Sequence, residues 1–320
     1  MDITPEIKKK LELLDEKYQT MGQDMNAYLD GLLYMDYLKY WDYIHTDTLL
    51  SLQNPRTNFP DEKIFIMYHQ ITELFFRLCI HEYEQIADKQ HIDANYLIKK
   101  VKRIVHYFDG LNTTYGIMID GMEKEQFLKF RMALLPASGF QSAQYRMIEL
   151  YSTDLVNLLN HEYAIKNPDV KKLSAEQMFE HIYWKTGATE LASGKKTLTL
   201  KQFEEKYSDQ FIELSKKCAK GNLYARYNEL PESEKSNPEL VQLMRQLDSN
   251  INVNWCLQHY KSAVRYLQGD PEIIAATGGT NWQKYLPPRF QKIIFFPELW
   301  TESEKQEWGK AWVEKVLEKQ

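Results

Sequence analysis

One long segment, residues 62–86, limits the possible folds more than any other part of the sequence. Its apolar side chains recur at helical spacing and cover a wide arc of the helix. A helix that is apolar around most of its circumference has to be covered by other elements, so we expect it at the centre of a helical domain. Asp61 is expected to cap it, after a polar loop over residues 54–60.

Glycine (13) and proline (11) are scarce for a chain of 320 residues, which favours long helices over a turn-rich β-protein. We expect a helix after a cap at Asp93, ended by Gly110 and Asn112, and a long helix that begins after a cap at Asn237. Residues 196–200 could be extended. The long helix after Asn237 is expected over residues 238–268, and the remaining expected helices cover residues 7–18, 124–135, 139–159 and 302–319.

No internal repeat, low-complexity linker or sharp boundary divides the chain. The sequence therefore predicts an all-α fold with one domain over residues 1–320. Within it, residues 1–55 form an N-terminal arm and residues 166–235 form a small, more polar helical insertion.

The charges are balanced: 40 basic and 45 acidic residues give a net charge of −5, without a long block of one sign. This composition argues against a protein that binds nucleic acid or a membrane surface. The N-terminus does not read as a signal peptide, and no apolar run reaches the roughly 20 residues of a membrane span. Three widely separated cysteines suggest unpaired thiols in a reducing compartment. We therefore expect a cytoplasmic protein.

The segment 130–146 contains helix-forming residues that are interrupted by Pro136 and by Ser138-Gly139. A break of this kind exposes backbone N–H groups and a positive helix end, which suit a carboxylate. Arg131 precedes the break and Arg146 follows it. The guanidinium of Arg131 could bind the carboxylate of an amino acid through two hydrogen bonds. An internal salt bridge explains this arginine equally simply.

Two histidines lie in expected helices among aromatic residues. His69 shares a helix face with Phe65, so its imidazole could donate to or accept from a ligand in an aromatic wall. His259 follows Trp255 by one turn, as in many helices that present an axial haem ligand. Spacing alone also allows each to be an ordinary core histidine.

Two further segments have a functional and a simpler interpretation. Thr277-Gly278-Gly279-Thr280 offers hydroxyl and backbone N–H groups to a carboxylate, or is simply a loop. His91-Ile92-Asp93 matches part of a non-haem iron site, but Asp93 is better explained as a helix cap.

Taken together and in order, these segments resemble the tryptophan 2,3-dioxygenase family, over roughly residues 29 to 300. The most specific match is the segment 130–146. The others are residues 34–38, 65–74, 277–280 and 295–300, together with His259, which stands where the family has its proximal haem ligand.

The resemblance implies a haem b cofactor with His259 as the iron ligand, and L-tryptophan and O2 as substrates. The product would be N-formylkynurenine, in the first step of tryptophan catabolism by the kynurenine route. It also implies a homotetramer with intertwined N-termini.

The roles that the resemblance implies for single residues are as follows. His69 would orient the indole N–H, Arg131 would pair with the substrate carboxylate, and Tyr37 and Leu38 would close the pocket from a neighbouring subunit. Further residues would form the aromatic wall (Phe65, Phe127), assist at the carboxylate and ammonium (Thr277, Gly278) and contact the haem propionates (Ser138, Tyr145, Arg146).

The sequence also departs from the family pattern. Residues are inserted between Leu38 and Leu49, the spacing from His259 to Thr277 is longer, and the Gly-rich loop lacks an opening Gly and a following Ser-Gly. The altered loop favours one alternative, a related haem oxygenase that acts on another aromatic amino acid. The other alternative is a helical haem- or ligand-binding protein without turnover.

Overall fold

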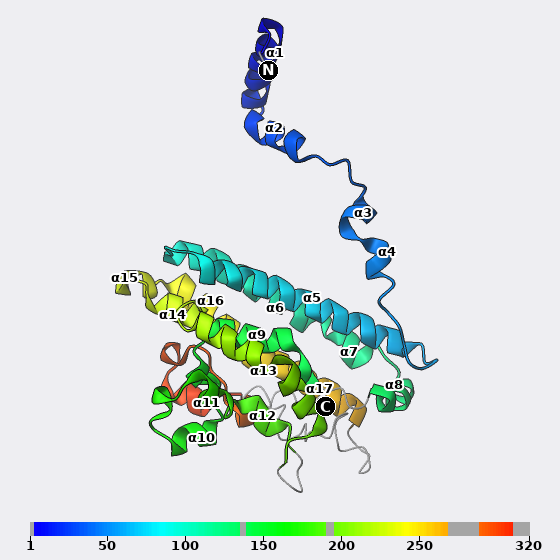
Figure 1. Ribbon diagram of the computed structural model, residues 1–320, viewed down its shortest axis with the longest axis vertical. Coiled ribbons are helices and arrows are strands. Elements are labelled where there is room, and N and C mark those ends of the chain that lie inside the picture. Colours follow the sequence, from blue (N-terminus) through cyan, green and yellow to red (C-terminus); the bar gives the residue numbers. More distant parts are fainter. Residues whose placement is uncertain (1–2, 135–138, 190–194, 268–287, 310–320) are drawn as a thin grey trace. The chain divides into compact units, whose positions relative to one another are not determined.

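The computed structural model describes residues 3–134, 139–189, 195–267 and 288–309. The chain divides into two compact units, Met1–Asn54 and Pro55–Gln320 (Figure 1). The described residues form helices and no β-strand, apart from two isolated bridges, so the all-α prediction is confirmed. Within the same ranges, no helix combines the length and the hydropathy that crossing a membrane requires.

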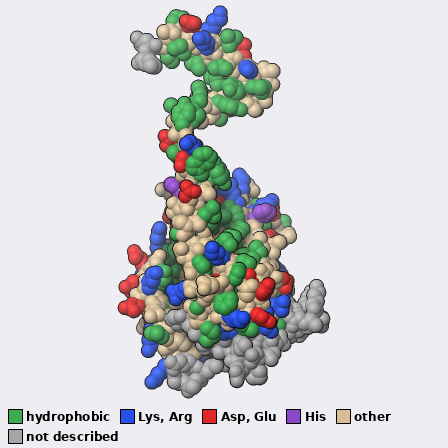
Figure 2. Space-filling view, turned by 90° about the vertical axis from the view of Figure 1, so that its right-hand side faces the viewer, with side chains coloured by type: hydrophobic (Ala, Val, Ile, Leu, Met, Phe, Trp, Pro, Cys, Tyr) green, Lys and Arg blue, Asp and Glu red, His purple; other side chains and the backbone are tan. Residues whose placement is uncertain are grey.

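The first unit consists of helices that bury none of their residues. They are α1 (Pro5–Thr20), α2 (Met25–Tyr34), α3 (Tyr40–Ile44) and α4 (Thr46–Leu49). The side chains of Thr4 and Asp24 cap the first two. Large apolar side chains are exposed along this unit, and Figure 2 shows them in green. They include Leu32, Leu33, Tyr34, Met35, Tyr37, Leu38, Tyr40, Trp41 and Tyr43.

In the second unit, α5 (Asp61–Asp88) buries one face in the core, but it is not covered on all sides as predicted, because Met67, Ile71, Leu74 and Leu78 are exposed. It packs against α6 (Ala94–Thr114), which lies beside it in Figure 1, and against α9 (Ala143–Ser152). The buried faces of these helices form one large core. Gly110 allows α5 and α6 to approach closely, because a Cβ atom there would lie 3.3 Å from the ring of Phe75.

Gly110 and Asn112 therefore do not end the helix, and that prediction was wrong: α6 continues to Thr114. Asp93 does cap it, with its side chain accepting from the Tyr96 N–H. Asp61 was also assigned wrongly. It is the first residue of α5, and its carboxylate accepts from the N–H of Glu123, which is the cap position of α8 (Lys124–Phe130).

The expected extended piece at residues 196–200 is instead the start of α13 (Leu198–Cys218). Thr197 caps this helix, since its hydroxyl accepts from the Leu200 N–H, and this cap outweighs the strand preference of a Thr-rich segment. The expected insertion contains further short helices: η4 (Val170–Lys172), α11 (Ala175–Phe179), α12 (Tyr183–Gly187), α14 (Leu223–Asn228) and α15 (Glu232–Lys235). Phe203, Phe211 and Leu223 join the main core.

The segment that follows α8 is the 3₁₀ turn η1 (Arg131–Leu134), and the chain re-enters the described part at η2 (Gly139–Gln141). Ser142 then caps α9. The expected helix over residues 139–159 is thus divided into η2, α9 and η3 (Leu155–Leu158). Two further short helices, α7 (Gly116–Asp120) and α10 (His161–Lys166), complete this half of the unit.

The expected long helix after Asn237 is present but is not uniform. It runs as α16 (Pro238–Ser249), a π-helical segment η5 (Asn250–Trp255) and α17 (Cys256–Leu267), with the Asn237 side chain as its cap. A period of 3.6 residues cannot reveal the wider π turns, which occur often at functional sites.

Asp248, at the end of α16, fixes the C-terminal segment. Its buried carboxylate accepts from the backbone N–H groups of Phe295 and Phe296, from the Trp300 indole and from the Asn252 amide. That segment contains α19 (Pro288–Gln291), η7 (Pro297–Leu299) and α20 (Glu302–Gln306). The expected helix over residues 302–319 begins as predicted but ends at Gln306, and a turn follows over residues 307–309; residues 310–319 lie outside the described residues.

Candidate functional site

The two histidines singled out from the sequence are held in the same way. The Nδ1 atom of His69 lies 2.7 Å from the carbonyl oxygen of Phe65, and that of His259 lies 2.9 Å from the carbonyl oxygen of Trp255. Because a carbonyl can only accept, each Nδ1 carries the proton and each Nε2 keeps its lone pair. Both imidazoles are therefore prepared to accept a hydrogen bond or to ligate a metal.

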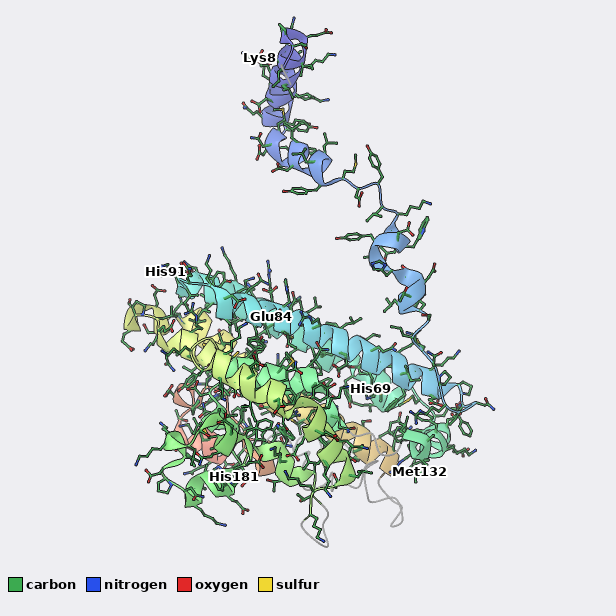
Figure 3. The ribbon with its side chains drawn as sticks, in the orientation of Figure 1. Lys8, His69, Glu84, His91, Met132 and His181 are labelled. Atoms are coloured by element: carbon green, nitrogen blue, oxygen red, sulfur yellow. The ribbon has the colours of Figure 1, made fainter. Side chains whose placement is uncertain are left out.

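The surroundings keep both imidazoles neutral. Burial lowers the pKa of His259 to about 4, and the charge that His69 can carry acts in the same direction. His69 is exposed at the surface. Neighbouring protein atoms nevertheless displace part of the water around its ring, and this desolvation lowers its pKa as well. Figure 3 marks its place on α5.

An aromatic wall surrounds His69. The ring centroid of Phe65 is 4.1 Å from that of His69, 6.4 Å from that of Phe127 and 5.8 Å from that of Phe130. Phe127 in turn packs on Tyr266 of α17 at 4.5 Å. The structure thus brings together Phe65 and Phe127, the two residues expected to form this wall, and adds Phe130 and Tyr266.

His259 has an aromatic surrounding of its own. Its ring lies 4.7 Å from that of Tyr115 and 4.6 Å from that of Trp255. A neutral helical imidazole with a fixed Nδ1–H and a free Nε2 has the chemistry of an axial haem ligand, and the flat aromatic rings nearby suit a flat macrocycle. The residues present therefore fit a haem with His259 at its iron.

Arg131 lies in η1, one helical turn after Phe127, and only 6% of its surface is exposed. Burial lowers the pKa of its guanidinium, yet an arginine remains charged at any physiological pH. The helix before it, α8, contacts both α5 and α17. A buried cation beside this wall is suited to an anionic group of a ligand.

Tyr145 and Arg146 lie on α9 and are committed to internal contacts. The Tyr145 hydroxyl donates to the Ile251 carbonyl of η5. Arg146 forms a buried ion pair with Glu149 at 2.9 Å, donates to the Tyr183 hydroxyl and packs over the Tyr145 ring. The Nε atom of Arg146 is buried and has no acceptor among the described residues.

The other residues expected in the site lie elsewhere. Ser138, Thr277 and Gly278 fall outside the described residues. Tyr37 and Leu38 belong to the first unit, where both side chains are exposed. The structure therefore brings together His69, Phe65 and Phe127, with Arg131 one turn beyond Phe127, and it places His259 on α17 beside the rings of Tyr115 and Trp255.

The comparisons with known proteins point to one family. The family model of tryptophan 2,3-dioxygenase matches residues 33–167. A tryptophan 2,3-dioxygenase of Ruegeria sp. (strain TM1040) is 26% identical over 281 residues, which cover 84% of this chain and 92% of that protein. One of Bradyrhizobium diazoefficiens is 28% identical over 268 residues, covering 82% and 91%. One of Anaeromyxobacter sp. (strain K) is 36% identical over 113 residues, covering 35% and 42%.

The chain is similar to the tryptophan 2,3-dioxygenase family. The segment matched by the family model contains His69, Arg131 and the wall residues Phe65 and Phe127, but it ends long before His259. The alignments with the full-length relatives extend over more than four fifths of the chain.

Sequence reasoning missed some features that complete the arrangement. The π-helical segment η5 and the rings of Tyr115, Phe130 and Tyr266 were not assigned to the site. One signal was available: Phe130 follows Phe127 by three positions, and Tyr266 follows His259 by seven. Each spacing places the two side chains on one helix face.

The lowered pKa of His259 predicts how the stability of the cofactor-free protein depends on pH. Folding favours the neutral ring, so its contribution is complete above pH 6.5 and is lost as the pH falls from 6.5 towards 4. Burial raises the pKa of Asp248 to about 6, so this carboxyl group increases the stability of the fold as the pH falls. Its effect is the same in the wild type and in His259→Gln and does not alter their comparison. The free energy of unfolding of the wild type and of His259→Gln can be measured with urea at pH 7.5 and at pH 5. It should decrease less between these pH values in the variant than in the wild type. Equal losses would contradict the assignment.

Proposed function

We propose that the protein is a haem-dependent dioxygenase that cleaves the indole C2–C3 bond of L-tryptophan with O2 and forms N-formylkynurenine. The observation that carries the proposal is the pair of imidazoles, His69 and His259, each with its Nδ1 at a backbone carbonyl oxygen and its ring beside an aromatic side chain. Relatives named tryptophan 2,3-dioxygenase align with most of the chain and support the same reaction. The step belongs to the kynurenine route of tryptophan catabolism.

His259 would hold the cofactor. Its Nε2 lone pair could ligate the iron of a haem b, while the Trp255 carbonyl fixes Nδ1. When bound, the haem supplies the oxygen chemistry, and the protein supplies binding and orientation. We assign Ser138, Tyr145 and Arg146 to the haem propionates. Arg146 would make this contact through its buried Nε, which is not used in the hydrogen bonds to Glu149 and Tyr183.

The substrate would lie on the distal side, beside His69. The Nε2 of His69 can accept the indole N–H, because its Nδ1 proton is committed to the Phe65 carbonyl. Phe65 and Phe127 would pack against the indole, and Arg131 would pair with the carboxylate, a geometry for which guanidinium is well suited. The resemblance adds Thr277 and Gly278 at the carboxylate and ammonium.

We further propose a homotetramer in the cytoplasm, in which Tyr37 and Leu38 close the site of a neighbouring subunit. The large apolar side chains exposed along Met1–Asn54 support an arm that is covered by another copy. The three unpaired thiols, Cys79, Cys218 and Cys256, suit a reducing compartment. The balanced charge gives no support to a nucleic-acid or membrane-surface partner.

The decisive experiment is the mass of the products formed from L-tryptophan by haem-loaded, reduced protein in air. Addition of two oxygen atoms supports the dioxygenase. Addition of one oxygen atom would instead indicate a related monooxygenase. Bound ferrous haem without any product, from tryptophan or from other aromatic amino acids, would favour a binding protein without turnover.

The role of His69 predicts a selective loss of activity. His69→Ala should keep its haem, because the iron ligand is on another helix, but should lower kcat/KM by about tenfold to a hundredfold, as expected for one lost hydrogen bond to a bound substrate. Methylation of the indole nitrogen should lower the activity of the wild type and have little further effect on the variant. Loss of haem from His69→Ala would make His69 a ligand or a structural residue instead.

A further inference from the structure

The helix that carries His259 contains the π-helical segment η5 immediately before it. A π turn accommodates one more residue than an α turn, so it rotates all later side chains by about 100° about the helix axis. The direction in which His259 points therefore depends on η5. Because π-helical geometry is less favourable than α-helical geometry, neighbouring groups have to hold it in place.

Asn250, the first residue of η5, provides the principal anchor. Its side chain is buried, with 4% of the residue exposed. Its Nδ2 donates to the Oδ1 atom of Asp109 on α6 at 2.7 Å, and its Oδ1 accepts from the Asn254 amide at 2.9 Å. The amide thus ties the start of the π turn to α6 and to the next turn of η5.

Two other contacts fix the same segment from different sides. The Tyr145 hydroxyl of α9 donates to the Ile251 carbonyl, and the Asn252 amide donates to Asp248. The last residue of η5, Trp255, supplies the carbonyl that accepts from the Nδ1 of His259 and a ring that packs on it. A displacement of η5 is thereby passed directly to the imidazole.

We infer that Asn250, hydrogen-bonded to Asp109, is a positioning residue for His259: it holds the π turn that directs Nε2 of His259 towards the iron. The inference rests on the proposed function, in which His259 is the axial ligand. Asn250 itself contacts neither cofactor nor substrate in this account and acts through Trp255 and His259.

The test is resonance Raman spectroscopy of the ferrous, haem-loaded protein, which reports the stretching band of the bond between iron and the His259 Nε2. In Asn250→Ala the band should shift and broaden, and haem should dissociate about 10- to 100-fold faster, the range found when a partner of a metal-ligating histidine is removed. The exchange variant Asp109→Asn with Asn250→Asp keeps an amide–carboxylate hydrogen bond at this place and should restore both.

Asn222→Ala is the matched control. Asn222 is equally buried and its amide donates to the Asp154 carboxylate, but it caps α14, a helix that carries none of the proposed site residues. It should lower stability and leave the band unchanged. If Asn250→Ala does not fold, Asn254→Ala replaces it, because it removes the hydrogen bond to the Asn250 Oδ1 and leaves the bond to Asp109 in place. The same Raman band and the same haem dissociation rate are then measured in that variant. A wild-type band and a wild-type dissociation rate in the folded variant would overturn the inference.

A second readout separates this inference from the proposed function. The ¹⁵N NMR signals of the His259 ring in protein without haem report whether Nδ1 holds the proton. The wild type should show this tautomer, and Asn250→Ala should show a mixture. A wild type that binds no haem would sink the proposed function, while the ring signals would still decide whether Asn250 positions His259.

Discussion

The His259→Ala variant should be purified without haem. His259 is the residue to which we assign the iron, and its ring is already neutral, with Nδ1 committed to the Trp255 carbonyl and Nε2 free. Alanine offers no ligand, and the nearby His69 is directed by its own bond to the Phe65 carbonyl. Haem per chain, measured from the pyridine haemochrome spectrum after reconstitution, should fall to background.

His181→Ala is the matched control for this experiment. His181 (marked in Figure 3) stacks on Tyr163 with ring centroids 3.6 Å apart, on a loop remote in sequence from α5 and α17. Its removal should leave the haem content unchanged. If His259→Ala also kept its full haem content, the assignment of the iron ligand would be wrong, and the functional proposal would have to begin from another residue.

The Arg146→Ala variant should lose about 3–5 kcal/mol of unfolding free energy, the usual cost of removing one partner from a buried ion pair. Glu149 is fully buried, and without Arg146 the Tyr183 hydroxyl would be its one remaining side-chain donor among the described residues. Its pKa is already raised by burial, so it would tend to take up a proton. Urea or guanidinium unfolding at pH 7.5 measures the loss.

A double variant distinguishes the internal pair from the proposed propionate contact. Arg146→Met with Glu149→Leu removes both charges and should recover most of the stability, since apolar replacements of a buried pair are often neutral. If the double variant is stable but binds haem weakly, Arg146 serves the propionates as well. A single variant as stable as the wild type would show that the pair with Glu149 contributes little.

Local signals in the sequence were sufficient to predict most helices, but not the contacts between them. The caps at Asp93 and Asn237 and the apolar face of α5 are encoded within a few residues, and these predictions are confirmed. Asp61 was assigned to its own helix, whereas its carboxylate accepts from the backbone N–H of Glu123, 62 residues away. In the sequence, Gly110 suggests a helix end, whereas in the structure it makes room for the ring of Phe75 from α5.

The same division between local and distant information applies to the candidate site. His69 and His259 could be chosen because each follows an aromatic residue by one turn, but nothing in the sequence shows that α7 and α8 pack against α17. Tyr266 meets the ring of Phe127, and Tyr115 meets that of His259, only through this packing. The pair of Arg146 with Glu149, by contrast, has a spacing of three residues that can be read from a helix, and the assignment to the propionates overlooked it.

The four hydrogen bonds that converge on Asp248 have a consequence for the order of events during synthesis. Asp248 adjoins the π turn that precedes His259, yet three of its donors belong to residues 295, 296 and 300. A ribosome makes those residues after α17, and the last of them must also leave the exit tunnel. The hydrogen bonds that hold Asp248 at the end of α16 can therefore all form only when this later segment has emerged. Under the proposed function, we expect haem capture to follow translation of the segment rather than accompany that of α17.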